Sequence, residues 1–193
     1  MNDKPQPAGI SRQDALELIK KYLPQDNLVK HCLATEAIMR VLAGKLGCDE
    51  AVWGIAGLLH DLDYTETKDQ MAQHTLQTEK ILQGIGVSRE VIDAIKGHNA
   101  DNLGFQRKTA FEHALTAAEC ITGLIVATAL VYPDKKLASV KPQSIIKRMT
   151  QKEFARSVNR DYIRECEKIG IPLEEFAALS LAAMCTVSDE LGL

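Results

Sequence analysis

Two adjacent side chains with different metal-binding chemistry, His60 and Asp61, end the apolar stretch AVWGIAGLLHDLDY. A neutral imidazole and a carboxylate supply the nitrogen and oxygen donors that borderline divalent metals prefer. Because an α-helix takes about 3.6 residues per turn, adjacent helical side chains point about 100° apart. One ion held by both side chains is therefore awkward, whereas an aspartate that bridges to a second ion is not. The pair predicts a metal site with further ligands elsewhere in the chain.

Four of the five histidines fall on apolar rows of separate predicted helices, because a helical residue shares a face with residues three or four positions away. The four are His31, His60, His74 and His98. A single histidine on an apolar row is more often a core residue than a ligand, but four such rows together favour a shared metal site. His113 lies about 120° around its helix from the apolar row at Leu115. We expect His113 to be a surface or packing residue.

Glu119 lies in the most apolar predicted helix, on the same row as Leu115. An isolated ionised carboxylate buried there would cost several kcal/mol, so it should be paired or bound to metal. No lysine or arginine lies within one turn of it. Inward histidines are natural partners of this carboxylate only if a cation sits between them. Small side chains flank the candidate ligands and favour close helix packing: Gly54, Gly57, Ala117 and Ala118.

The remaining patterns predict an all-α protein. Capping residues, glycine stops and the helical period predict helices over residues 11–22, 26–47, 49–61, 70–83, 88–98, 109–131 and 173–191, with shorter helices from about residue 142. Residues 65–69 are predicted to form a polar loop, and no strand pattern or repeat is visible. We expect a single domain, residues 1–193, as a bundle of about seven to nine helices. Its metal-binding core would cover about 28–131, with the helices of 142–193 packed on it.

Composition narrows the class of protein. The 193 residues are 46% hydrophobic and 25% charged, as in a soluble globular domain, and the 5% aromatic content favours helices over sheets. Five cysteines without a Cys-x-x-Cys pair predict a reduced, cytoplasmic protein with free thiols. The polar start MNDKPQPAGIS does not resemble a signal peptide. The apolar run at 123–132 is too short for a bilayer span of about 20 residues, so we expect no membrane association.

The net charge of −3 argues against stable binding to nucleic acid. Residues 134–160 nevertheless carry eight basic and two acidic side chains. We interpret this segment as a solvated basic surface rather than an anion-attracting rim of an active site. No motif places its basic residues against phosphate oxygens; the candidates are Lys135, Lys136, Lys141, Arg148 and Arg160. The sequence Gly84-Ile85-Gly86 lacks the lysine and the serine or threonine of a P-loop and is predicted to be a helix end.

The order of the candidate ligands resembles the HD superfamily, which is named for its His-Asp doublet and consists largely of metal-dependent phosphohydrolases. The resemblance covers roughly residues 28–131. Its core pattern of a histidine and a His-Asp pair matches His31, His60 and Asp61 directly. The distal aspartate of that pattern falls at Glu119, a departure that lengthens the side chain by one methylene. The stretch GLIVATALVYPDKKLASVKPQSIIKR also looks like a group of bacterial HDIG-type HD proteins.

The resemblance implies a binuclear layout, because His74 and His98 correspond to the two additional histidines of the binuclear branch. One ion would be held by His31, His60, Asp61 and Glu119. Asp61 would bridge to a second ion, held also by His74 and His98. Nitrogen and oxygen donors suit one or two divalent transition metal ions: Mn, Fe, Co, Ni or Zn. Such ions lower the pKa of bound water from 15.7 towards about 7 and supply hydroxide near neutral pH.

The resulting hypothesis is a metal-dependent phosphohydrolase. Its substrate would be a small-molecule phosphate ester, either a phosphomonoester or a nucleotide-like phosphodiester. A di-iron oxygenase, as in the myo-inositol oxygenase branch of the same fold, remains an alternative. A catalytically silent HD module that binds a ligand is another, because Glu119 replaces the usual aspartate. Asp63 could orient a ligand histidine or relay a proton, and we favour a third role, capping the loop.

Overall fold

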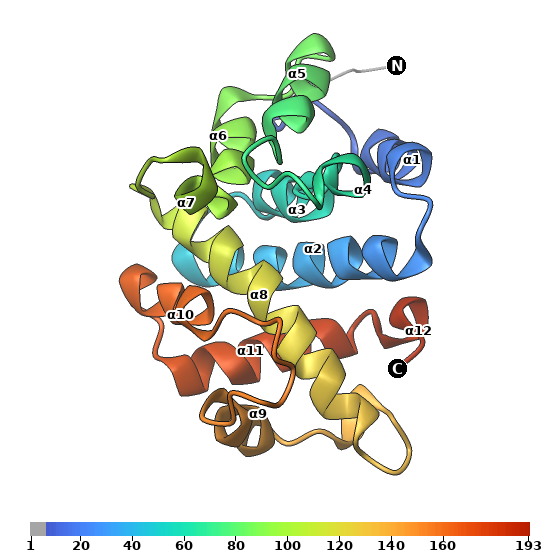
Figure 1. The fold of residues 1–193 in the computed structure, drawn as a ribbon, viewed down its shortest axis with the longest axis vertical. Coiled ribbons are helices and arrows are strands. Elements are labelled where there is room, and N and C mark those ends of the chain that lie inside the picture. The colour runs from blue at the N-terminus through green and yellow to red at the C-terminus, as the bar shows by residue number, and fades with distance from the viewer. Residues whose placement is uncertain (1–6) are drawn as a thin grey trace.

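The computed structural model describes residues 7–193, and these form helices without any strand (Figure 1). The longer α-helices are α1 (Arg12–Tyr22), α2 (Asp26–Leu46), α3 (Glu50–Leu59), α5 (Leu76–Gly84), α6 (Arg89–His98), α8 (Ala110–Leu130), α9 (Pro142–Met149) and α11 (Leu173–Cys185). Single turns of helix are α4 (Tyr64–Thr67), α7 (Ala100–Leu103), α10 (Arg160–Ile163) and α12 (Ser188–Leu191). Two 3₁₀ helices are η1 (Leu137–Ser139) and η2 (Arg164–Ile169). The predicted all-α class is confirmed.

Local capping signals set several of the helix ends. The side chains of Ser11 and Asp49 accept hydrogen bonds from the first backbone amides of α1 and α3. Thr109 and Glu112 form a reciprocal capping box at the start of α8. Gly47 adopts a left-handed conformation, φ 71°, and ends α2. Because each of these signals is local, the sequence predicted these boundaries correctly.

Three predicted elements differ from the structure. The helix expected over 70–83 begins only at Leu76, because Thr75 adopts φ 74° and the chain before it forms turns. The expected loop at 65–69 instead contains part of α4. The last helix is also divided, since α11 ends at Cys185 and α12 starts at Ser188. β-branched Thr186 lies at this break and donates its hydroxyl to the Ala183 carbonyl, which competes with helix continuation.

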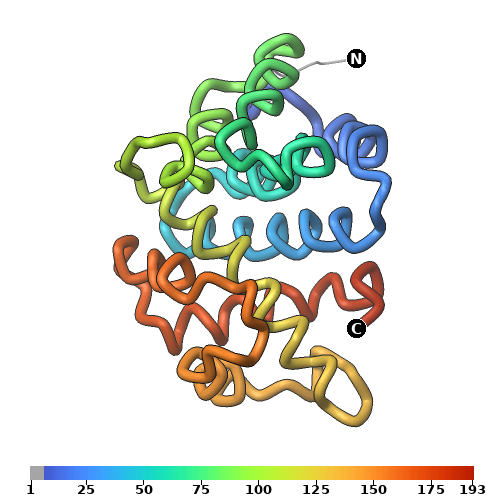
Figure 2. Tube along the Cα trace, viewed as in Figure 1, coloured from blue at the N-terminus to red at the C-terminus, as the bar shows by residue number. Residues whose placement is uncertain are grey.

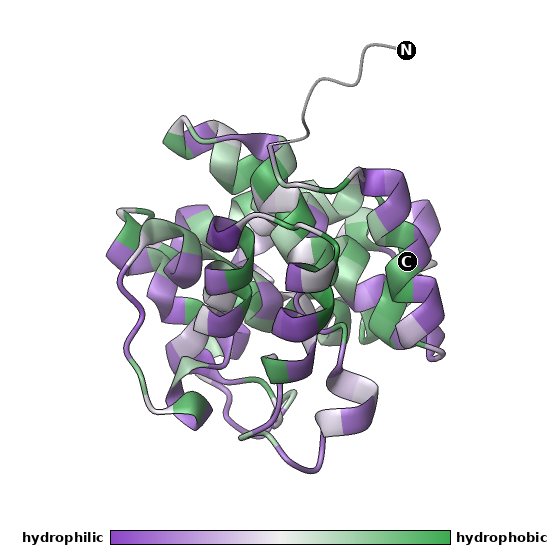
Figure 3. Ribbon diagram, turned by 90° about the horizontal axis from the view of Figure 1, so that it is seen from above, coloured by the Kyte–Doolittle hydropathy of each residue, from purple (hydrophilic) through white to green (hydrophobic). Residues whose placement is uncertain are grey.

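Helix α8 crosses the centre of the molecule (Figures 1 and 2). It packs on α2, α6, α9, α10 and η2. Helix α2 lies between α3 and α11, so it separates the α1–α6 region from the carboxy-terminal helices. Most helices carry both hydrophobic and hydrophilic residues (Figure 3), as amphipathic helices around a common core should.

Helices α2 and α3 approach each other closely at Gly57. A Cβ atom at this position would lie 2.9 Å from the Thr35 carbonyl oxygen and 2.9 Å from the Glu36 amide nitrogen. Only glycine therefore permits the observed helix separation. Glu36 itself is buried but paired, with its carboxylate 2.6 Å from Arg12 Nε and 2.7 Å from Arg40 Nη2. This ion cluster ties α1 to α2 and was not anticipated from the sequence.

Helix α8 is long and apolar enough to cross a membrane when judged by length and composition alone. Within the protein, 61% of its most apolar window is buried against other helices. Burial of this kind is typical of the central helix of a folded core.

Candidate metal centre

Four imidazoles and one carboxylate converge where α2, the end of α3, the turn before α5 and the end of α6 meet. Their ligand atoms form two groups, and within each group all atoms lie within 4.8 Å of one another. The groups are His31, His60 and Asp61, and Asp61, His74 and His98. Asp61 belongs to both groups. This arrangement can hold two ions with one carboxylate between them.

The outward ring nitrogens of two histidines fix their tautomers. Nδ1 of His60 lies 2.8 Å from the Gly57 carbonyl oxygen, and Nδ1 of His98 lies 2.5 Å from the Ile95 carbonyl oxygen. A carbonyl oxygen only accepts hydrogen bonds, so each Nδ1 carries a proton. In the neutral form, the Nε2 atom of each ring therefore presents a lone pair to the centre.

Side chains hold Nδ1 of His31 and of His74, so the Nε2 atoms of these rings also face the centre. Nδ1 of His31 lies 2.9 Å from the hydroxyl oxygen of Thr122, which donates its own proton to the Glu119 carbonyl oxygen at 2.6 Å. That hydroxyl must therefore accept from His31. Nδ1 of His74 donates to the Asp63 carboxylate at 2.7 Å. Hydrogen-bonded outer nitrogens of this kind are typical of metal-ligating histidines.

The resulting geometry leaves nitrogen lone pairs facing one another. Nε2 of His31 lies 3.1 Å from Nε2 of His60, and Nε2 of His74 lies 3.0 Å from Nε2 of His98. Two neutral imidazoles cannot share a hydrogen bond when both protons are committed to outer partners, as for His31 and His60; between His74 and His98, the extra proton that His74 retains without metal can occupy the gap. A divalent cation satisfies both lone pairs and the adjacent carboxylate, so the residues fit a transition metal.

The surroundings of His31 and His98 favour the neutral forms of these two imidazoles beside an ionised Asp61. Burial, reinforced by His60, lowers the pKa of His31 to about 4. Burial, with His74 next to it, also lowers the pKa of His98 well below its usual value. Burial opposes ionisation of Asp61, but the surrounding imidazoles outweigh it and hold the pKa of this carboxyl far below its usual range. Neutral imidazole and carboxylate are the forms that bind metal.

His74 differs from the other histidines in both placement and charge. It lies in the turn before α5 rather than on a helix, so the predicted helical row through it was wrong. Burial disfavours its charged form, but hydrogen bonds with Asp61 and Asp63 outweigh that effect and raise the pKa of His74 to about 9. Binding of a metal at this position therefore displaces a proton from His74.

Glu119 lies on α8 and lines the same cavity, but its carboxylate belongs to neither group of ligand atoms. It accepts a hydrogen bond from Cys120 Sγ at 2.8 Å. Burial raises the pKa of Glu119 to about 8. A metal ion near this side chain would stabilise the ionised form, so direct ligation by Glu119 stays a prediction.

The centre opens into a cavity of about 270 Å³ whose wall includes residues that the sequence did not single out. These include Tyr64, Met71, Asn99, Asn102 and Tyr162. Asn99 donates to the carbonyl oxygens of Met71 and His74 and so holds the turn that carries His74. The position of Asn99 directly after His98 was the one sequence signal that could have identified it as a site residue. Tyr162 comes from α10, with its ring beneath the Arg107 guanidinium and its hydroxyl bonded to Asp101.

The basic segment 134–160 supplies none of the described residues that line this cavity. Arg160 donates to the backbone carbonyls of Ala155 and Val158, and Arg148 lies over the Phe154 ring at 4.7 Å. These arginines stabilise local structure. The interpretation of the segment as a surface feature therefore agrees with its position.

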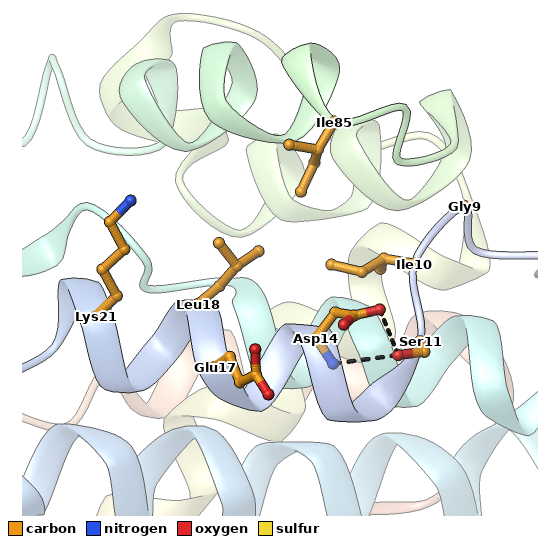
Figure 4. A pocket seen from close by; sticks show the side chains of 8 residues that line it. All are labelled: Gly9, Ile10, Ser11, Asp14, Glu17, Leu18, Lys21 and Ile85. Atoms are coloured by element: carbon orange, nitrogen blue, oxygen red, sulfur yellow. Dashed lines mark hydrogen bonds between the residues drawn. The ribbon is translucent and has the colours of Figure 1, made fainter.

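His113 lies apart from the cluster, as expected. Its Nδ1 atom lies 2.5 Å from the Glu165 carboxylate, and the pair joins α8 to η2. A larger cavity of about 620 Å³ lies between α1 and Ile85 at the end of α5 (Figure 4). Ile10, Leu18 and Ile85 face this space, and none of the clustered histidines lines it.

Comparisons with known proteins match the part of the chain that contains the clustered histidines. A family model described as "HD domain" matches residues 28–129. Ribonuclease Y of Nitratidesulfovibrio vulgaris is 31% identical over 97 residues, and that of Thermus thermophilus is 31% identical over 96 residues. These matches cover 50% and 48% of this chain but only 18% and 17% of the relatives. No solved structure matches the chain. Because the family model spans more than half of the chain, the protein belongs to the HD domain family.

Proposed function

We propose that the protein is a metal-dependent phosphohydrolase that acts on a phosphomonoester or a nucleotide-like phosphodiester. One observation carries the proposal: two pairs of inward Nε2 atoms, those of His31 with His60 and of His74 with His98, flank a shared Asp61. The HD domain family supports the general class, a metal-dependent phosphohydrolase superfamily. The matched relatives are named as ribonucleases, which is consistent with chemistry at a phosphorus–oxygen bond.

In this proposal, the chain's residues hold two divalent ions and orient them. The first site consists of His31, His60, Asp61 and Glu119. The second site consists of Asp61, His74 and His98. Asp61 can serve both because Oδ1 lies 3.3 Å from His74 Nε2 and Oδ2 lies 3.7 Å from His31 Nε2. When bound, such ions activate a water molecule and neutralise charge on a phosphoryl group.

The cavity wall supports a role for the ions in binding the phosphoryl group. Among the described lining residues there is no lysine or arginine, so the protein itself offers no fixed positive charge there. The hydroxyl of Tyr64 could orient a phosphoryl oxygen, and so could the second N–H of Asn102, whose first N–H donates to Asn99 Oδ1 at 2.7 Å. Tyr162 contributes to the same wall from α10, which supports the expected packing of residues 142–193 on the 28–131 core.

The test begins with anaerobic purification and elemental analysis of the bound metal. A panel of phosphomonoesters and phosphodiesters is then assayed with added Mn²⁺ or Co²⁺, using Asp61→Asn as the matched variant. We expect metal-dependent release of phosphate or of a nucleotide, lost in Asp61→Asn. Oxygen-dependent turnover of an organic substrate by an iron-loaded protein that is inert to phosphate esters would instead identify an oxygenase. Tight ligand binding without turnover would identify a silent binding module.

A further inference from the structure

A second, largely aliphatic cavity adjoins the metal centre. It has a volume of about 360 Å³ and lies between α2, α8 and α12. Its wall includes Ala34, Val126, Ala127, Leu130 and Leu191. His31 also lines this cavity, and the same side chain lines the cavity of the metal centre. The two cavities therefore meet at one imidazole.

His31 is the most accessible histidine of the cluster. Its side chain is 24% exposed, whereas those of His60, His74 and His98 are 1%, 2% and 7% exposed. Its orientation is nevertheless fixed, because Thr122, another residue of the apolar cavity, holds its Nδ1 atom. A molecule in the apolar cavity therefore lies against a rigid edge of the metal centre.

The rim of this cavity exposes apolar surface that the fold does not use. Leu130 is 50% exposed at the end of α8, next to Ala127 on the same helix. Besides His31 and Thr122, the polar side chains of the lining are Asn27 and Lys30 from one turn of α2, and Lys30 is paired with Asp26 at 2.9 Å. Small-molecule sites typically combine an apolar wall with a few convergent polar groups.

We propose that this cavity binds the apolar alcohol portion of a phosphate ester whose phosphoryl group lies at the metal centre. This inference rests on the proposed function and names its substrate class, an alkyl or similarly apolar phosphomonoester. In the reaction, the oxygen of water forms a bond to phosphorus and the phosphorus–oxygen bond to the alcohol breaks. The leaving alkoxide takes up the proton that water loses, which yields the apolar alcohol and inorganic phosphate.

Chain length provides the first test. With Mn²⁺-loaded protein, kcat/KM for alkyl phosphates from methyl to hexyl should rise by up to about fourfold for each methylene that the cavity buries. Ala127→Phe should fill the cavity and abolish this rise. Ala178→Phe, the same change at a half-buried alanine of α11 that lines neither cavity, should leave the rise intact. Leu130→Asp, at an exposed rim position, provides a second variant that keeps the fold and should also weaken the preference for hexyl phosphate.

Binding separates this inference from the proposed function. Calorimetry with the non-hydrolysable probes methylphosphonate and hexylphosphonate should show at least tenfold tighter binding of the hexyl compound, lost in Ala127→Phe. Hydrolysis that is indifferent to chain length, together with equal affinity for both phosphonates, would overturn the inference and leave the phosphohydrolase proposal intact. Chain-dependent binding without hydrolysis of any ester would reject the phosphohydrolase proposal and retain the apolar site.

Discussion

The Asp63 carboxylate accepts a 2.7 Å hydrogen bond from Nδ1 of His74 and also accepts hydrogen bonds from backbone amides at the start of α5. One side chain therefore orients a candidate metal ligand and positions the helix that follows it. From the sequence we favoured capping of the local loop, with orientation of a histidine as an alternative. The structure shows orientation of His74, and the backbone amides that the carboxylate accepts belong to the start of α5 and not to α4.

Replacing Asp63 should weaken metal binding at the second site. Asp63→Asn keeps an oxygen for the backbone amides but removes the charge that holds His74, so the affinity for the second Mn²⁺ ion should fall about 10–100-fold. Isothermal titration measures this change. Asp49→Asn is the matched control, because Asp49 caps α3 without contacting a histidine of the cluster. Equal affinities in the Asp63→Asn and Asp49→Asn proteins would contradict the role given to Asp63.

Each substitution of a ligand should remove a defined number of ions. Asp61→Ala should lose both ions, because this carboxylate belongs to both groups. His98→Ala should lose one ion, whereas His113→Ala should retain both because its ring pairs with Glu165 elsewhere. Elemental analysis after reconstitution and desalting measures the stoichiometry. Loss of metal from His113→Ala, with retention in His98→Ala, would show that the ligand set is wrong.

The close contact of α2 and α3 should make Gly57 intolerant of a side chain. In Gly57→Ala, the new Cβ would meet backbone atoms of α2 at 2.9 Å, so the helices must separate. We expect a loss of about 1–3 kcal/mol in the free energy of unfolding, as for other overpacked cores. Gly84→Ala in α5 is the control, since nothing lies within 4 Å of a Cβ there. Urea denaturation compares the two; an unchanged stability of Gly57→Ala would refute the steric constraint.

The metal-free protein should become less stable as the pH rises from about 6.5 to 8. Burial raises the pKa of Glu119 to about 8. Burial opposes the charged form of His74, but hydrogen bonds of His74 with Asp61 and Asp63 outweigh this effect and raise its pKa to about 9. Between these pH values, Glu119 and His74 keep protons in the folded state that they have largely released in the unfolded state. The free energy of unfolding therefore falls with increasing pH.

Chelator-treated protein unfolded in urea at several pH values measures this trend, and Glu119→Gln should reduce its slope. Excess Mn²⁺ should reverse the sign of this pH dependence, because metal binds the deprotonated ligands and stabilises the folded state more at higher pH. A stability of the metal-free protein that rises over this window would show that neither side chain retains its proton.

Much of the site could be predicted from the sequence because its signals are local. The adjacency of His60 and Asp61 and the apolar rows around His31 and His98 depend only on helical periodicity and the residue types. The capping residues at α1, α3 and α8 likewise act within one turn of their own positions. These features sufficed to predict the helical class and four of the five residues whose ligand atoms cluster; the fifth, His74, was selected on a helical row that the structure does not contain.

The sequence by itself thus determined the helices, the types of donor and the family pattern of the site. Only the tertiary structure decided that His74 lies in a turn, since the hydrogen bonds that Asp63 accepts cross eleven to fifteen residues of chain. It also decided that Tyr162 lines the metal cavity and that His31 borders an apolar one. These relationships arise from the packing of distant segments around α8, and periodicity within one helix carries no information about which segments meet.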